Sequence, residues 1–407
     1  MFVKLSNPLG LAGDPTTQQG FCPEPVFMST LAVEPASTRP VSGFFQRQSP
    51  VYLILGSFLF LTVPLTALAI AKRDLLDRWH IGLLYIIGLG TTHFVLTFTI
   101  YFQSSNLRHF NSTWTNRILY FLIPAAIFVF FDVYHALQIA LYLPLFDTLL
   151  FWGIRFFDFQ HFGRQSYGVL QLFKGRAQSP FPAWARKAEN LYFFGLTCLL
   201  MLTFLRGGRI DVNWLPMQIA MSVVGVLLIV LLAGFVASWK RAGRKQALAA
   251  PFAYFLLQSG SAALGIYSSA LYLVCLAAHY VEYHVLMVPR CFHTTLDPQS
   301  RTDRIFDRLR RNRVIFYLVL LAVAGAVTTL TWQVMGMMIA QPDRSPAGSY
   351  RFLIALFDGL FVFHYFIESF IWKFSDPYYR KTLGPLYFSQ NRPAAPAPAA
   401  SKCAPGI

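Results

Sequence analysis

The sequence FLIALFDGLFVFHYFIESFIWK, residues 352–373, determines how the rest of the chain is interpreted. This run is long and apolar enough to cross a bilayer as one helix, since a span needs about 20 such residues. It nevertheless contains Asp358, His364 and Glu368. His364 and Glu368 are four residues apart and therefore share one face of a helix. Because an ionisable side chain at membrane depth costs at least about 2.5 kcal/mol, the pair indicates a functional site.

The composition places the whole chain among helical membrane proteins. Of its 407 residues, 55% are hydrophobic, 16% aromatic and only 13% charged, whereas a soluble domain carries about 25% charged residues. Several further apolar runs reach the length of a span. We therefore predict an all-α polytopic integral membrane protein, a bundle of roughly 8–10 transmembrane helices around a buried cluster of histidines and carboxylates.

Basic residues outnumber acidic ones by 34 to 18, which gives a net charge of +16. Many of them lie in short segments between apolar runs, a pattern typical of the positive-inside rule. The excess predicts contact with anionic phospholipid headgroups and no nucleic-acid binding. The expected location is the cytoplasmic (inner) membrane of a bacterium. The 5 cysteines are scattered without a CxxC motif, which argues against a disulfide framework or a cysteine-ligated metal.

Three regions are predicted along the chain. Residues 1–48 lack the apolar core of a signal peptide and are expected to form a polar, disordered tail. Residues 49–388 form the predicted transmembrane domain, with a first span at Val51–Ala71. Residues 389–407 are a low-complexity Pro/Ala tail.

The boundaries of several spans follow from prolines and from run lengths. Pro144 is expected to break the long apolar run that starts near Ile118. Residues 251–292 would make about 60 Å of helix, so two spans hinged at residues 259–265, SGSAALG, fit a bilayer better than one. Residues 174–190, with two prolines and four bases, are predicted to be a loop.

Ionisable residues recur inside the apolar runs at helical spacing. Most histidines in these runs have a carboxylate three or four residues away, so that both groups share a helix face. Estimated depths of these pairs in the bilayer overlap, which predicts that they converge. The candidate metal ligands are His93, Asp132, His135, Asp158, His161, His279, Glu282, His284, His364 and Glu368.

Imidazole and carboxylate ligands without thiolate suit iron, manganese or zinc. The candidates are numerous enough for two ions, and we predict two iron ions, with manganese or zinc as alternatives. Glu-x-x-His pairs on two helices converge in a comparable way in di-iron helical bundles, although the order and residue types here differ. The clustered HxxxH and HxxHH boxes of membrane desaturases are missing from the sequence.

The leading functional hypothesis is a membrane-embedded, metal-dependent oxidoreductase that uses oxygen to hydroxylate or desaturate a lipid or other hydrophobic substrate. It would need a separate electron donor, because no nucleotide-binding motif stands out; no catalytic residue is assigned. The first alternative is a haem-binding electron-transfer protein with paired histidines as axial ligands. The second is a proton-coupled transporter that uses buried His, Asp and Glu, and the third is a non-enzymatic assembly subunit. Each pair also has a simpler interpretation as a structural, self-neutralising hydrogen bond.

Overall fold

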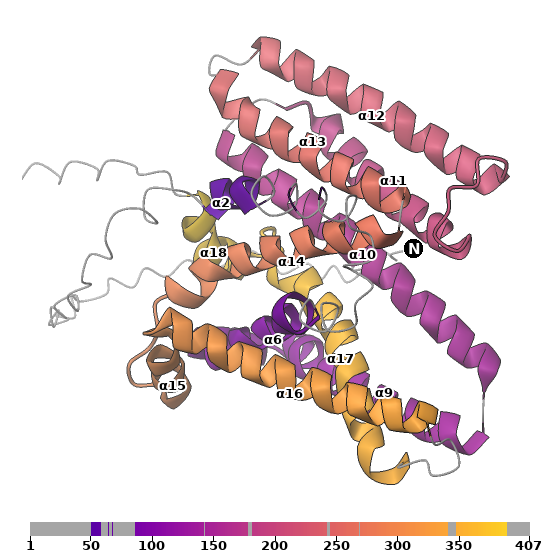
Figure 1. The fold of residues 1–407 in the computed structure, drawn as a ribbon. Coiled ribbons are helices and arrows are strands. Elements are labelled where there is room, and N and C mark those ends of the chain that lie inside the picture. Colours follow the sequence, from indigo (N-terminus) through magenta and orange to yellow (C-terminus); the bar gives the residue numbers. More distant parts are fainter. Residues whose placement is uncertain are drawn as a thin grey trace, which may run out of the picture. The chain divides into compact units, whose positions relative to one another are not determined.

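The computed structural model describes residues 50–57, 64, 67, 86–141, 143–177, 181–241, 245–267, 269–340 and 347–388, and within these ranges the chain forms helices and no strand (Figure 1). Both predicted tails, and the predicted first span beyond Ser57 apart from residues 64 and 67, lie outside the described residues. The division into two tails and one transmembrane domain therefore remains a prediction.

The helices that the structure describes have the following bounds: α2 Pro50–Ser57, the π-helix η2 Ile86–Thr91, α6 Thr92–Thr97, the 3-10 helix η3 Phe98–Phe102, α7 Ser104–Asn111, α8 Trp114–Arg117, the π-helix η4 Ile118–Leu122, α9 Ile123–Leu141, α10 Pro144–Ala177, α11 Ala183–Leu205, α12 Leu215–Arg241, α13 Lys245–Tyr267, α14 Ser269–Phe292, α15 Arg301–Arg310, α16 Arg313–Ala340, α17 Ala347–Ile371 and α18 Pro377–Phe388.

The protein is a multi-span helical membrane protein. Within the described residues, 6 helices are long and apolar enough to cross a bilayer, or 7 if the bent segment at residues 86–111 is one span. Two further helices, α10 with 34 residues and α14 with 24, are also long enough at about 1.5 Å per residue. They carry several of the ionisable residues of the candidate site. The candidate spans among the described residues therefore number 6 or 7, fewer than the predicted 8–10, and α10 and α14 are not among them.

The observed helix bounds confirm the predicted break at Pro144, confirm the predicted pair of helices in residues 251–292 in part, and contradict the predicted loop at residues 174–190. Pro144 is the first residue of α10, where a missing N–H costs nothing. Residues 251–292 do form two helices, but SGSAALG lies inside α13 and the break comes later, between Tyr267 and Ser269. The predicted loop at residues 174–190 is mostly helix, because α10 continues to Ala177 and α11 already begins at Ala183.

Gly265 lies at the point where α14 turns back against the end of α13. A Cβ at this position would lie 3.2 Å from the Cys275 sulfur and 3.4 Å from Cα of Tyr272. Glycine therefore lets α14 return close against α13. Gly265, the last residue of the SGSAALG segment, thus serves close helix packing rather than a turn within the segment.

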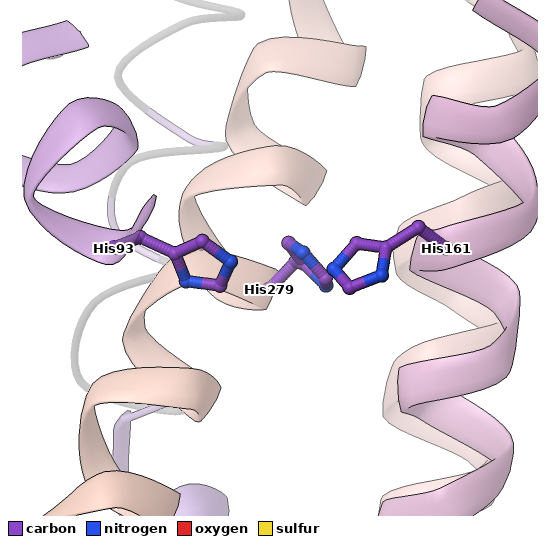
Figure 2. Close-up of side chains that lie close together, drawn as sticks. All are labelled: His93, His161 and His279. Carbon is purple, nitrogen blue, oxygen red and sulfur yellow. The ribbon is translucent and has the colours of Figure 1, made fainter. Parts of the chain in front are cut away.

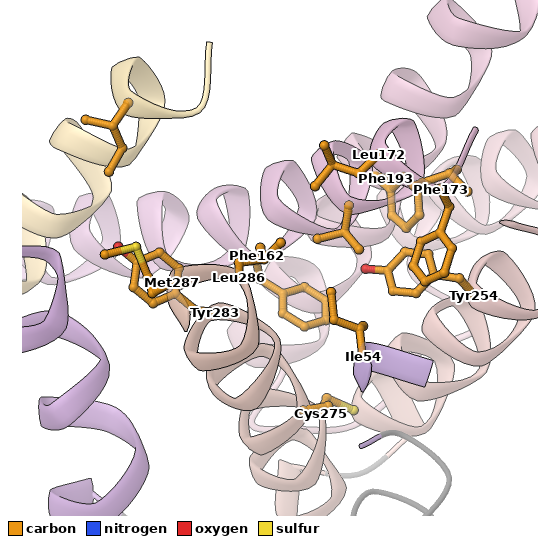
Figure 3. Packing of buried hydrophobic residues seen from close by; sticks show 14 of the residues in the cluster. Ile54, Phe162, Leu172, Phe173, Phe193, Tyr254, Cys275, Tyr283, Leu286 and Met287 are labelled. Carbon is orange, nitrogen blue, oxygen red and sulfur yellow. The ribbon is translucent and has the colours of Figure 1, made fainter. Parts of the chain in front are cut away.

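A single apolar core joins the helices that surround the candidate site. Figure 3 shows Phe162 of α10 packed near Tyr283 and Leu286 of α14, with Tyr254 of α13 and Ile54 of α2 farther along the same core. Helix α17 packs along α9, and Gly359 of α17 gives room for the ring of Phe128. Helices α10, α14 and α17 all contribute buried residues to this core, which holds them against one another.

Candidate metal centre

His93 lies on an irregular helical segment. The π-helix η2 leads into the short helix α6, which carries His93, and the 3-10 helix η3 follows. Gln103 then adopts an extended conformation, and α7 leaves at 78° to the preceding segment. Single π-helical turns are frequent at functional sites in helical proteins. The imidazole of His93 is fully buried.

Five candidate ligands from four helical segments meet in the interior. His93 comes from α6, His161 from α10 and His279 from α14, and α17 supplies His364 and Glu368. Figure 2 shows the rings of His93, His279 and His161 directed toward one another from their separate helices. No member of this set, the histidine cluster, is more than 8% exposed. Residues more than 270 positions apart in the sequence are thus brought into contact.

The centre of the histidine cluster is Nε2 of His364. It lies 2.8 Å from Nε2 of His93 and 3.1 Å from Nε2 of His161. The carboxylate of Glu368 is 3.3 Å from the His161 nitrogen and 3.9 Å from that of His364. Four potential ligand atoms therefore surround one small volume.

The cluster contains two overlapping sets of three side chains that can hold a metal ion. One set is His93, His161 and His279, and the other is His161, His364 and Glu368; in each set the ligand atoms lie within 4.8 Å of one another. Two ligand nitrogens at about 2.1 Å from one ion and at right angles to each other are about 3.0 Å apart. The distances between the histidine nitrogens match this value, so the donor set fits a metal ion.

Neighbouring side chains hold the ligands in position. The hydroxyl of Thr97 is 2.6 Å from Nδ1 of His364 and 2.8 Å from the hydroxyl of Tyr283. Trp372 donates its indole N–H to Glu368 at 3.3 Å. Hydrogen bonds of this kind fix the orientation of metal-binding side chains. One further atom, Nδ1 of His93, is buried without a hydrogen-bond partner among the described residues.

Asp158 does not join the cluster although it is one turn from His161. It accepts a hydrogen bond of 2.7 Å from Tyr365 and a longer one of 3.5 Å from Tyr272. Arg155 lies 3.7 Å from the same carboxylate. The Asp158 carboxylate is therefore occupied by its own partners beside the site.

Glu282 and His284 lie on α14 with His279 but outside both sets of candidate ligands. Gln165 donates its amide N–H to the Glu282 carboxylate at 3.2 Å and to the His279 backbone carbonyl at 2.9 Å. The ring of His284 is 6.3 Å from that of His93 and 6.0 Å from that of Tyr317. These two residues border the cluster instead of forming it.

Asp132 and His135 of α9 lie in a separate part of the bundle. Nε2 of His135 lies 2.9 Å from a carboxylate oxygen of Asp358 of α17, within hydrogen-bond distance. This contact joins the same two helices that meet at Gly359, and neither Asp132 nor His135 belongs to a set of candidate ligands. The structure thus brings together five of the ten sequence-derived candidates and places the other five beside the cluster or away from it.

The residues that sequence reasoning missed are the neutral ones, above all Thr97 and Tyr283. Thr97 follows His93 by four residues, so the spacing rule that paired histidines with carboxylates would have found it if hydroxyls had been included. Tyr283 lies between Glu282 and His284, within the ionisable segment of α14. Its role as a partner of Thr97 depends on packing between distant helices and has no local signal.

Fold and site together define a helical multi-span membrane protein with a buried histidine cluster that can bind a metal ion. The sequence matches no known protein family and no characterised protein, and the structure matches no solved one.

Proposed function

We propose that this chain is a membrane-embedded, metal-dependent oxidoreductase that acts on a lipid or another hydrophobic substrate. The observation that carries this proposal is the crowding at Nε2 of His364, which faces two other imidazole nitrogens and a carboxylate. A neutral imidazole nitrogen either donates one hydrogen bond or accepts one. Hydrogen bonds alone therefore cannot satisfy all three contacts of the His364 Nε2 atom. A cation placed among these nitrogen and carboxylate atoms would be bound by all of them.

The ligand types favour iron. His161, His364 and Glu368 are two histidines and one carboxylate, the combination that binds non-haem iron in oxygen-dependent enzymes. Such an iron supplies the redox chemistry needed for oxygen-dependent hydroxylation or desaturation. His93 and His279 extend the ligand set toward a second ion, which supports the expectation of two metal ions.

The surroundings favour a hydrophobic substrate. The cluster lies between α10, α14 and α17 and is lined by buried aromatic side chains, including Phe94 and Tyr283. These side chains exclude water from the site, and an apolar substrate dissolved in the bilayer can approach it without passing through water. A separate protein would supply the electrons.

Haem binding has less support from the geometry. Two histidines that bind one haem iron on opposite faces keep their nitrogens about 4 Å apart, twice a metal–nitrogen bond. The nitrogens of His93 and His364 are 2.8 Å apart. A porphyrin ring between them would require the helices to separate.

Elemental analysis of the purified full-length protein tests the proposal. We expect iron in stoichiometric amount, and we expect the alanine variants of His161 and His364 to lose it. His135→Ala is the matched control, since it also removes a histidine from an apolar helix but should retain the metal. A chain that folds normally yet binds no transition metal after gentle extraction would contradict the proposal, and pH-driven uptake by proteoliposomes would instead support a transporter.

A further inference from the structure

A buried arginine near the histidine cluster forms no ion pair or hydrogen bond with a carboxylate among the described residues, although Glu368 lies within electrostatic range. Arg290 of α14 is 1% exposed. Its Nη1 donates to the backbone carbonyl of Ile371 at 3.3 Å, while Nε and Nη2 have no acceptor within the described part of the chain. Buried charges are as a rule paired, because removal from water without compensation is strongly unfavourable. The guanidinium therefore has the capacity for an anion that these residues do not supply.

The side chains around Arg290 are aromatic and already engaged. The guanidinium lies 5.5 Å from the ring centre of Trp372 and 5.7 Å from that of Tyr379. The Tyr379 hydroxyl donates to Tyr120 at 2.9 Å, and the Tyr387 hydroxyl donates to the backbone carbonyl of Leu286. The short helix α18, which carries Tyr379 and Tyr387, thus covers Arg290 with rings, and neither tyrosine hydroxyl accepts a hydrogen bond from Nε or Nη2.

Arg290 is linked to the candidate metal centre through Trp372. The indole that stacks near the guanidinium donates its N–H to Glu368 at 3.3 Å. Ile371, whose carbonyl Arg290 binds, follows Glu368 by three residues, or about one helical turn. Arg290 also stands near the end of α14, just before the polar helix α15, where the chain leaves the apolar region.

We infer that Arg290 binds the anionic head of an amphiphilic substrate, a carboxylate or a phosphate ester, whose hydrocarbon chain extends toward His364 and Glu368. The planar guanidinium offers two parallel N–H donors, which match these anions better than a lysine ammonium does. The inference rests on the proposed function in one respect, the hydrophobic substrate. It adds that this substrate carries a single anionic end.

Ligand-dependent thermal stability of the full-length protein tests the inference, after bound lipid and metal have been removed. Three probes carry the same length of monounsaturated hydrocarbon chain and differ in the head: oleate, oleoyl lysophosphatidate and uncharged oleyl alcohol. Inorganic phosphate, which has no chain, is the fourth. We expect oleate or the lysophosphatidate to raise the unfolding temperature saturably. Arg290→Gln should weaken that binding at least about tenfold, because a hydrogen bond to a charged group is lost.

Two further variants separate binding from folding. Arg311→Gln removes an exposed arginine of the same region and should leave the affinity unchanged. If Arg290→Gln does not fold, Arg290→Lys keeps the charge but loses the paired donors, and should also bind at least about tenfold more weakly. Equal affinity in the wild type and the folded Arg290 variants would overturn the inference. So would oleyl alcohol or inorganic phosphate binding as tightly as the anionic amphiphile, and because the assay contains no metal, such a failure leaves the metal proposal untouched.

Discussion

At the scale of single residues, Thr97 is the group that most directly controls the candidate ligands. Its hydroxyl is 2.6 Å from Nδ1 of His364 and so determines which way the central imidazole faces. A hydroxyl can donate or accept, which lets it adapt to whichever tautomer would present Nε2 to a metal ion. Loss of this contact leaves the ring free to rotate.

We predict that Thr97→Val weakens metal affinity by about 10–100-fold, the usual effect of removing a hydrogen bond that orients a ligand. The measurement is competition with a chelator of known affinity. Thr99→Val is the control, because the Thr99 hydroxyl bonds to the Leu96 carbonyl and not to a ligand. Equal losses in both variants would show that the effect comes from the local helix and not from His364.

At the scale of helices, α10 and α11 approach closely because Gly163 lacks a side chain. A Cβ at Gly163 would lie 3.0 Å from the backbone carbonyl oxygen of Phe193 and still closer to a methyl group of Thr197. The backbone of α11 cannot move aside easily. Since His161 is two residues from Gly163, this contact also positions a candidate ligand.

We predict that Gly163→Ala destabilises the protein by about 1–3 kcal/mol through overpacking. Gly168→Ala on the same helix is the matched control, because its Cβ would meet nothing within 4 Å. That variant should be neutral or stabilising by up to about 1 kcal/mol, since alanine favours a helix over glycine. Thermal unfolding in detergent compares the two, and similar melting temperatures would refute the close-contact account.

A buried ion pair also joins α10 to α11. Lys174 lies 2.7 and 2.9 Å from the two carboxylate oxygens of Glu189, and Gln171 donates to one of them at 2.9 Å. The ammonium also lies 4.0 Å from the ring centre of Phe181. In the segment predicted to be a loop, Lys174 and Glu189 are therefore accommodated on buried helix faces as a neutralising pair.

We predict that Glu189→Ala costs about 3–5 kcal/mol, because the Lys174 charge would remain buried without its partner. Replacing both residues by apolar ones, Lys174→Met with Glu189→Leu, should restore most of the loss. Unfolding midpoints of the single and double variants provide the double-mutant cycle. If the loss of stability in the double variant equalled the sum of the losses in the two single variants, the two charges would not interact.

At the scale of the whole molecule, the histidine cluster links four helical segments that are far apart in sequence. A ligand that binds only the folded chain stabilises it by mass action. We predict that a chelator lowers the free energy of unfolding by about 4 kcal/mol when the free metal concentration is a thousand times the dissociation constant. Unfolding of His364→Ala should not respond to the chelator, and a response equal to that of the wild type would place the bound metal elsewhere.

The sequence predicts the class of fold because uninterrupted apolar runs of about twenty residues are typical of membrane-spanning helices. It also predicts which helix faces carry His and carboxylate groups, since spacing alone determines those faces. It does not reveal which groups meet. Asp158 and His161 have the same spacing as Asp132 and His135, yet only His161 reaches the cluster. The difference arises from competing partners such as Tyr365 and Asp358, which both belong to α17, a helix distant in sequence from either pair.

The irregular segment that carries His93 has a consequence for the kinetics of metal exchange. His161, His279 and His364 stand on long, continuous helices whose backbone hydrogen bonds resist local opening. His93 stands on six residues of α-helix between a π-helical and a 3-10 turn, where hydrogen bonding changes register twice. We therefore expect His93 to be the last of these ligands to bind an ion and the first to dissociate from it. The residence time of the ion would then be determined by one short turn of backbone, not by the bundle around it.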